Sequence, residues 1–290
     1  MNTASSKIPV GRGSALVRAI IMAAVLVAIL SGLGWISANI LQPNLPNMAV
    51  AGLRAVLTSL LVMGIVWLMH RHLQRRSWSE LGFVRTSSAI ITFLFGAAFW
   101  IVLATGGIMA GVYLGYIELA ISPFSLTALG IVAFHILVVF FYEALPEETV
   151  IRGYIMNQLD DAAGRFVAVI GQAILFMLFG FGVVALSGLM GLPTGWEIGA
   201  DRVILFLSFG ITLALLRIWT GSLWTAMGFH TAFQTTIQLM GQNRFISVNP
   251  ADAASFNEIA IFSWMSAIAL GGVIALIAVL LKRRRPVRAA

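Results

Sequence analysis

Three carboxylates and one guanidinium stand close together near the middle of the chain. The carboxylates belong to Glu143, Glu147 and Glu148, and the guanidinium belongs to Arg152. Residues four apart lie on one face of a helix, so Glu148 and Arg152 are expected to form an ion pair. Glu147 lies one position round and points elsewhere. Such a carboxylate can serve as a general base, tuned for proton transfer by burial and by neighbouring charge.

The same cluster also fits a purely structural role. Ionisable groups cost about 2.5–3.5 kcal/mol each in the middle of a membrane helix, which makes function the first hypothesis where they occur. Charge clusters are nevertheless common at the cytoplasmic ends of membrane helices, where an ion pair needs no chemistry to explain it. Pro146 removes one backbone hydrogen bond where the acids begin and favours a kink there.

His230 is the second residue type suited to catalysis, and Gln234 follows it by one helical turn on the same face. At about 1.5 Å per residue, His230 lies ~15 Å along its helix from Thr220. An imidazole and an amide stacked in this way can polarise a carbonyl group or stabilise an oxyanion. A single buried His that is hydrogen-bonded between helices is an equally good interpretation of His230 alone.

The composition identifies the environment in which these residues must work. Hydrophobic residues make up 60% of the chain and charged residues 10%, against about 45–50% and about 25% in soluble domains. The absence of cysteine excludes disulfides, thiolate metal sites and cysteine nucleophiles. The net charge of +7 does not indicate nucleic acid as a partner, because the basic residues stand between and beyond the apolar runs.

The elements that position the polar residues are therefore expected to be membrane-spanning helices, since a span needs about 20 mostly apolar residues. The sequence predicts an all-α, polytopic bundle with about eight spans. They lie roughly at 15–41, 49–69, 89–117, 126–146, 165–189, 202–219, 221–241 and 258–281. Most Lys and Arg residues then fall on one side, which places both termini in the cytoplasm.

At the acidic cluster and at His230 the chain resembles a known family. Glu147-Glu148-x-x-x-Arg152 followed by Gly153 is similar to the first motif of the CPBP family. This family contains the CAAX proteases and bacteriocin-processing enzymes and is also called Abi. His230-x-x-x-Gln234 is similar to its last motif, in which His is followed four residues later by Asn or Asp. The resemblance covers roughly residues 125–240.

The resemblance implies intramembrane proteolysis like that of the type II CAAX prenyl protease. Glu147 would activate a water for attack on the scissile amide, supported by Glu148 and Arg152. His230 and Gln234 would stabilise the tetrahedral oxyanion. The partners would be the lipid bilayer and a peptide or protein substrate, with the site open to the cytoplasm in a bacterial cytoplasmic membrane. The chain would divide into N-terminal spans (1–124), a CPBP-like catalytic core (125–241) and a last span with a basic tail (242–290), all in one integral membrane domain.

The sequence departs from the family pattern in two places. The middle motif of the family is Phe, three residues, then His, whereas here Phe176 is followed at that spacing by Gly180. Gln234 replaces the Asn or Asp of the last motif and keeps an amide on a longer side chain. Without the middle His, a divalent metal such as zinc, which needs about three protein ligands, has only Glu147, His230 and one further carboxylate to bind it. The sequence therefore leaves open whether the protein binds a metal cofactor.

Three functions remain in contention. An endopeptidase with Glu147 as base is favoured by the retained first and last motifs. A catalytically inactive relative that acts as a membrane binding or bacteriocin-immunity protein is favoured by Gly180. A transporter using Glu143 and Glu147 as proton or cation sites is favoured only by the lone carboxylates.

The remaining histidines are assigned to structural roles. His70 and His72 lie in the basic segment after the second predicted span and are expected at the surface. His135 lies far from the acidic cluster on the same predicted span and is expected to be a core residue with a hydrogen-bond partner.

Overall fold

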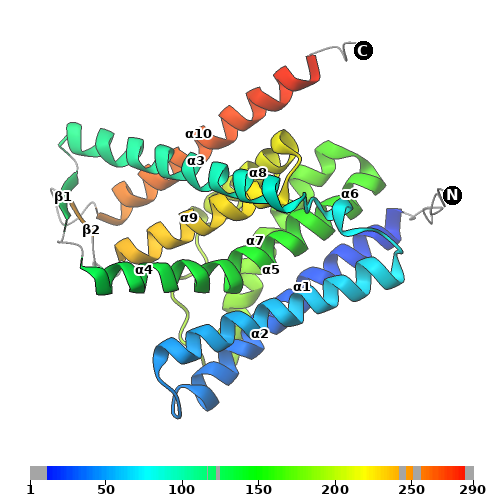
Figure 1. Cartoon of the computed structure of the whole chain (residues 1–290), viewed down its shortest axis with the longest axis horizontal. Helices are drawn as coiled ribbons and strands as arrows, with labels where there is room; N and C mark the ends of the chain where they lie inside the picture. Colours follow the sequence, from blue (N-terminus) through cyan, green and yellow to red (C-terminus); the bar gives the residue numbers. More distant parts are fainter. Residues whose placement is uncertain (1–11, 116, 122–124, 242–245, 251–255, 285–290) are drawn as a thin grey trace. The chain divides into compact units, whose positions relative to one another are not determined.

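The computed structural model of the chain describes residues 12–115, 117–121, 125–241, 246–250 and 256–284, and these are predominantly helical (Figure 1). The helices are α1 (Arg12–Ile36), α2 (Asn47–Trp67), α3 (Thr86–Tyr113), α4 (Leu126–Val139), α5 (Leu145–Glu148), α6 (Met156–Ala163), α7 (Arg165–Leu189), α8 (Ala200–Thr220), α9 (Leu223–Gly241) and α10 (Phe256–Arg284). Strands β1 (Ile117–Ile121) and β2 (Ile246–Pro250) pair antiparallel, with Leu119 opposite Val248.

Within the described residues, seven helical segments are long and apolar enough to cross a membrane. They are Gly13–Leu41, Asn47–His72, Ser87–Tyr113, Leu126–Ala163, Arg165–Leu189, Ala200–Thr220 and Trp264–Lys282. The prediction of an all-α, polytopic membrane bundle is confirmed. About eight spans were expected. The segment predicted as a span at 221–241 forms the 19-residue helix α9, but α9 is not among the seven apolar segments. His230, Gln234 and several threonines lower its hydropathy.

By contacts the chain divides into two compact units. Unit 1 comprises Met1–Arg85 and Phe141–Ile211, and unit 2 comprises Thr86–Phe140 and Thr212–Ala290. Two continuous helical segments pass from one unit to the other, the first between Phe140 and Phe141 and the second between Ile211 and Thr212. The division predicted from the sequence, with a catalytic core at residues 125–241, is a division by function and stays a prediction.

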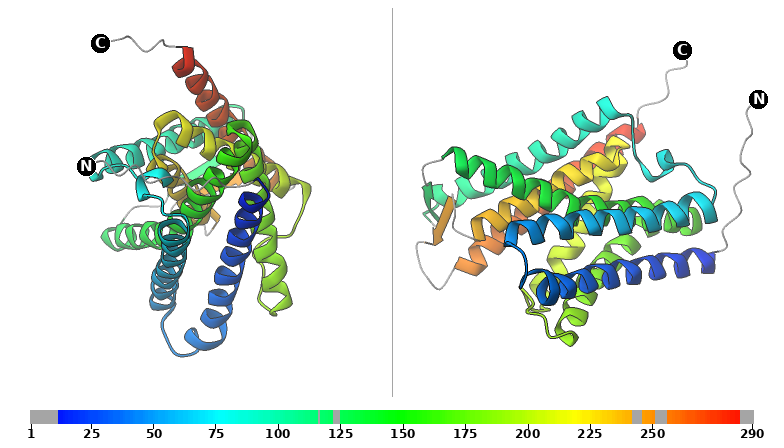
Figure 2. Two further views of the ribbon diagram at one scale, coloured as in Figure 1. Left: turned by 90° about the vertical axis from the view of Figure 1, so that its right-hand side faces the viewer. Right: turned by 60° about the horizontal axis from the view of Figure 1, so that its bottom comes forward.

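In unit 1, α1 packs against α2, α6 and α7. Figure 2 shows α1 and α2 side by side along much of their length. Small residues are buried on α1 and at its contact with α7: Ala15 and Ala19 on α1 are fully buried, and Gly182 on α7 lies against Val27 on α1. Close approach of helices at small residues is the usual way in which membrane helices associate.

In unit 2, α3 packs against α9 and α10. The contact between α3 and α9 brings the two backbones together at a reciprocal pair of glycines. A Cβ atom at Gly228 would fall on the carbonyl oxygen of Phe93, and one at Gly96 would fall on that of Thr225. Because the obstructing atoms are backbone atoms, no side-chain rotation can make room for an added methyl group.

We therefore expect Gly228→Ala to lower the free energy of unfolding by about 1–3 kcal/mol, the usual cost of overpacking. Gly106→Ala on α3 is the matched control, because a Cβ there meets nothing within 4 Å. Alanine is the better helix former by about 0.8–1.0 kcal/mol, so the control should be neutral or slightly stabilised. Thermal unfolding in detergent would measure both, and equal midpoints for the two variants would contradict the close approach.

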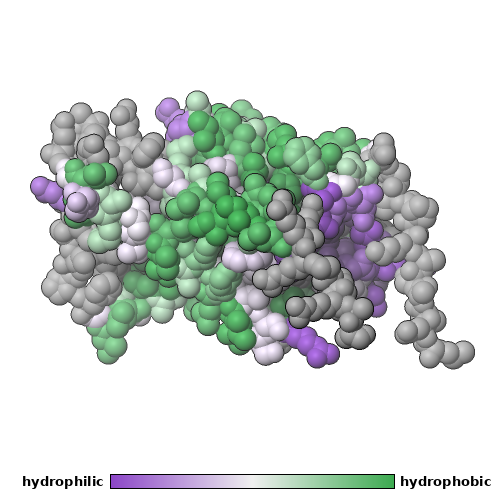
Figure 3. Space-filling view, turned by 90° about the horizontal axis from the view of Figure 1, so that it is seen from above, coloured by the Kyte–Doolittle hydropathy of each residue, from purple (hydrophilic) through white to green (hydrophobic). Residues whose placement is uncertain are grey.

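Apolar side chains are abundant on the outside of the helices, as a membrane requires. Figure 3 shows hydrophobic residues over much of one face. Leu60, Ile91 and Val102 expose 66%, 68% and 68% of their surface, respectively. Side chains of this kind at this exposure need a lipid environment, since soluble monomers seldom expose large contiguous apolar patches.

Candidate active site

The acidic cluster lies in one continuous helical segment, Leu126–Ala163, whose winding changes along its length. After α4, residues Phe140–Ala144 form a π-helical segment. The short α5 carries Pro146, Glu147 and Glu148, and a second π-helical segment, Thr149–Ile155, leads into α6. π-Helical turns are rare and are frequently found at functional sites. Here they stand on both sides of the paired glutamates.

Pro146 explains part of this winding. In a π-helix the amide N–H of residue 146 would donate to the carbonyl oxygen of Phe141, but proline has no N–H. The hydroxyl of Ser59 on α2 donates to that oxygen instead. Ser59 is 7% exposed, so the bond is shielded from solvent. A side chain from another helix thus replaces the hydrogen bond that Pro146 cannot make.

We expect Ser59→Ala to lower the free energy of unfolding by about 1–3 kcal/mol, because a buried carbonyl group loses its donor. Thr58→Val is the matched control. Its hydroxyl is also buried, but it has no hydrogen-bond partner within the described part of the chain. The control should therefore be close to neutral when unfolding is measured by heat or denaturant. A loss as large for Thr58→Val as for Ser59→Ala would contradict the role given to Ser59.

Glu148 and Arg152 form the expected ion pair. Arg152 Nη1 lies 2.9 Å from Glu148 Oε1, and both side chains are 0% exposed. The guanidinium carbon also lies 4.2 Å from the centre of the Phe176 ring on α7, a cation–π contact. Phe176 is the aromatic residue of the degenerate middle motif. The arginine is therefore held from two sides, by a carboxylate on its own helix and by an aromatic face.

Glu147 directly precedes Glu148 in α5 and is 9% exposed. The charges that act on it come from Glu143, Glu148 and Arg152. Arg152 is bonded to Glu148, so the ion pair and the nearly buried Glu147 follow one another in the same helical segment. This is the arrangement that the spacing of the three residues predicts.

A buried polar network follows the motif directly. Gln74 donates to the hydroxyl of Tyr154 at 2.6 Å, and Gln158 donates to Gln74 at 3.0 Å. Tyr154 is fully buried two residues after Arg152, so the network ties the segment after α2 to the motif helix. These residues were not predicted as part of the site, because nothing in the local sequence pattern indicates that they meet.

The histidines outside the motifs differ in part from expectation. His70 is 2% exposed, and its Nε2 donates to the carbonyl oxygen of Ser77 at 2.9 Å, so its assignment to the surface was wrong. The bond closes the chain reversal after α2, which explains the burial. His72 is exposed as expected. His135 on α4 is half-buried and does not belong to the fully buried core.

The second group of predicted site residues lies on α9 in unit 2. His230 is 1% exposed, and Gln234 is half-buried one turn further on. The adjacent face of α9 is fixed by Trp100 of α3, whose ring packs against Phe229 and Phe233 at 5.3 and 4.9 Å between centroids. The Trp100 indole also donates to Thr236 at 3.2 Å. These contacts set the rotation of α9 and so the direction in which His230 points.

The structure thus gathers the predicted residues into two groups. Glu147, Glu148 and Arg152 lie together in unit 1, and His230 and Gln234 lie together in unit 2. Trp100 and Ser59, which position the two groups, were missed. Only the proline signalled that a carbonyl group would need a donor, and nothing in the sequence identified which donor.

Gly180 stands where the middle motif of the family has histidine. The space that a side chain at this position would take is filled by Phe206 of α8. A Cβ at Gly180 would lie 2.5 and 2.6 Å from two ring carbons of Phe206. The Phe206 ring therefore takes the space of a side chain at position 180. Glycine here is part of the packing between α7 and α8, and a histidine could enter only if Phe206 moved.

A metal site receives no support from the residues that the structure describes. Among them, no group of three or more His, Cys, Asp or Glu side chains is gathered as a metal ion requires. Glu148 is engaged by Arg152, which leaves fewer oxygen ligands in unit 1.

The comparison with known families agrees with the motifs. Residues 129–236 match the family described as type II CAAX prenyl endopeptidase Rce1-like. The resemblance to the CAAX-protease family is confirmed. The matched segment is rather more than a third of the chain and includes both motifs and Gly180. No curated protein and no solved structure matches the chain. The matched family of membrane proteases and the seven apolar helices together indicate an integral membrane protein that contacts the lipid bilayer.

Proposed function

We propose that the chain is an intramembrane endopeptidase of CAAX-protease type, with Glu147 as the general base. One observation carries this proposal. Within the segment that matches the family, Glu147 is nearly buried beside a fully buried Glu148–Arg152 ion pair. A salt-bridged helix end explains Glu148 and Arg152 but gives no reason for a second acid next to them.

The reaction requires a base, an oxyanion donor and a proton for the leaving group. Glu147 takes a proton from water, and the resulting hydroxide attacks the carbonyl carbon of the scissile amide. His230 and Gln234 donate hydrogen bonds to the tetrahedral oxyanion. When the intermediate collapses, the C–N bond breaks and the proton held by Glu147 passes to the departing amine. Glu148 and Arg152 keep Glu147 in position throughout.

The proposed substrate is a peptide or protein attached to the membrane, cleaved at the cytoplasmic side of a bacterial cytoplasmic membrane. The match to prenyl endopeptidases supports a lipid-modified chain end, and the apolar helices support access from the bilayer. The concentration of basic residues on one side of the predicted spans supports the orientation with cytoplasmic termini.

A double-mutant cycle tests the shared role of the two groups. Glu147→Gln, His230→Ala and the double variant would be assayed on a panel of prenylated and unprenylated peptides in liposomes. Groups that act on one transition state give strongly non-additive losses. The double variant should therefore be little worse than Glu147→Gln alone. Activity that survives in Glu147→Gln, or losses that multiply, would contradict the proposed mechanism.

Gly180 favours a second candidate, a catalytically inactive relative that acts as a membrane binding or bacteriocin-immunity protein. The two candidates differ in what a histidine at this position achieves. Gly180→His alone should be destabilised by about 1–3 kcal/mol because of the Phe206 ring. Gly180→His with Phe206→Ala has room for the imidazole. If peptide cleavage appears only in this double variant, the natural chain is the inactive relative.

A further inference from the structure

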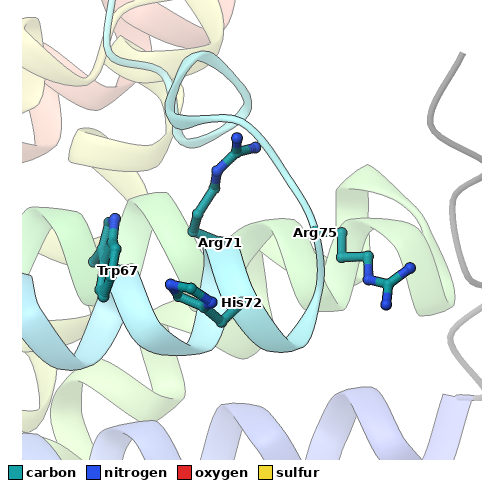
Figure 4. A pocket seen from close by; sticks show the side chains of 4 residues that line it. All are labelled: Trp67, Arg71, His72 and Arg75. Carbon is teal, nitrogen blue, oxygen red and sulfur yellow. The ribbon is translucent and has the colours of Figure 1, made fainter. Parts of the chain in front are cut away.

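A cavity of about 670 Å³ opens in unit 1 at the end of α2, away from the acidic cluster along the chain. It is lined by Trp67, Arg71, His72 and Arg75. Figure 4 shows Trp67 and His72 next to each other on the helix, Arg71 on the same helical end and Arg75 on the segment that follows. The volume lies within the range of about 300–1,000 Å³ that is common for ligand sites.

Arg71 and Arg75, which line the cavity, differ from the neighbouring Arg76 in their ion pairing. Arg76 is 8% exposed and forms an ion pair with Asp161 of α6. Arg71 and Arg75 are exposed and have no ion-pair partner within the described ranges of the chain. One guanidinium of this short stretch therefore has a structural partner, whereas the cavity concentrates positive charge without a carboxylate.

The backbone produces this separation. Arg75 has a φ of 55°, a left-handed conformation that is uncommon for residues other than glycine. The next amide, that of Arg76, then donates to the carbonyl oxygen of His70 at 3.0 Å. This turn directs Arg76 to Asp161 and leaves Arg75 at the cavity. The left-handed backbone at Arg75 therefore accounts for a second guanidinium group at the cavity, beside that of Arg71.

The position along the chain identifies the surroundings of the cavity. The apolar segment Asn47–His72 ends at this point, so the cavity lies where a membrane span gives way to the headgroup region. Trp67 is 46% exposed, and its ring meets that of His72 edge-on at 4.5 Å between centroids. Tryptophan is enriched at this depth because its ring is amphipathic. Arginine at the same depth attracts anionic headgroups.

We propose that this cavity binds the phosphate group of an anionic phospholipid. The Arg71 guanidinium group holds the phosphate oxygens, since its planar, forked donors match phosphate geometry. Arg75, which points away from Arg71 in Figure 4, adds positive charge at the edge of the same cavity. The exposed Trp67 ring lies against the glycerol and upper acyl region. The site is independent of peptide hydrolysis and would exist equally in an inactive relative.

The test is lipid retention by the purified full chain in detergent, measured by native mass spectrometry. Phosphatidylglycerol and phosphatidylcholine would be titrated onto the wild type, Arg71→Gln/Arg75→Gln, and the charge-matched control Arg85→Gln/Lys282→Gln. The first phosphatidylglycerol should bind about tenfold more weakly to the cavity variant than to wild type. The control and the phosphatidylcholine titrations should show no such difference.

Further arms distinguish the source of the phosphate. Inorganic phosphate and glycerol phosphate, each at millimolar concentration, should not displace the lipid. Displacement by either would overturn a lipid site in favour of a soluble phosphate site. An equal loss in the control variant would overturn the proposal, because binding would then follow net charge. Trp67→Ala, which keeps both arginines, should weaken retention by a smaller factor, and unchanged retention would contradict the part assigned to the ring.

Discussion

Glu147→Gln is expected to reduce peptide-bond hydrolysis by about 10²–10⁴-fold while the protein stays folded. General bases contribute rate factors of this size, and glutamine keeps the volume of the side chain but cannot accept the proton of water. The fold should tolerate the change, because the ion pair that stabilises this segment is made by Glu148 and Arg152. Initial cleavage rates in liposomes, with thermal unfolding as the check on folding, measure both quantities.

Glu143→Gln is the matched control for this prediction. Glu143 lies one turn before Glu147 in the π-helical segment and acts on it as a neighbouring charge. It is outside the paired motif, so its loss should change the rate by no more than about tenfold, as a single-charge perturbation does. Equal losses in the two variants would contradict the assignment of Glu147 alone as the general base.

Arg152→Met is expected to lower the free energy of unfolding by about 3–5 kcal/mol, because it leaves the carboxylate of Glu148 buried without its cation. Glu148 and Arg152 are both 0% exposed, so solvent cannot compensate for the loss. The contact of the guanidinium with Phe176 is lost as well. Denaturation of wild type and variant in the same detergent would measure the difference.

A compensated variant separates stability from catalysis. Glu148→Leu with Arg152→Met replaces the pair by apolar side chains, a change that is often neutral or stabilising in a buried site. We expect this variant to regain the stability that Arg152→Met loses. It should remain poorly active, because Glu147 would lack the groups that position it. A double variant as unstable as Arg152→Met, or as active as wild type, would contradict the role of the pair.

The acidic motif shows what a sequence can predict and where it stops. Spacing alone predicted the pair of Glu148 with Arg152, since four residues make one helical turn. Pro146 predicted a disturbance of the helix but neither the π-helical segments nor Ser59, because the compensating donor comes from a residue 82 positions away. Contacts of this separation depend on how helices pack, and no local pattern encodes them.

In the rest of the bundle, too, the membrane spans could be predicted from the sequence and the packing around Gly180 and α9 could not. Composition predicted the membrane-spanning architecture, because hydropathy is a property of each segment by itself. The missing histidine at 180 was visible in the sequence, but the Phe206 ring that fills its place was not. Likewise α9 was expected as one more apolar span, whereas its polar residues set it apart from the seven apolar helices. Its rotation is fixed by Trp100 of α3.

The most direct test of the proposed activity is hydrolysis in water enriched in the heavy oxygen isotope. Purified wild-type protein and Glu147→Gln would be reconstituted in liposomes with a prenylated peptide panel. Mass spectrometry would then follow the new carboxyl terminus. We expect wild type to release a product that carries heavy oxygen in that carboxylate, and Glu147→Gln to release none above background. Folded wild-type protein that yields no labelled product from any peptide would contradict the endopeptidase proposal and favour a membrane-embedded binding protein.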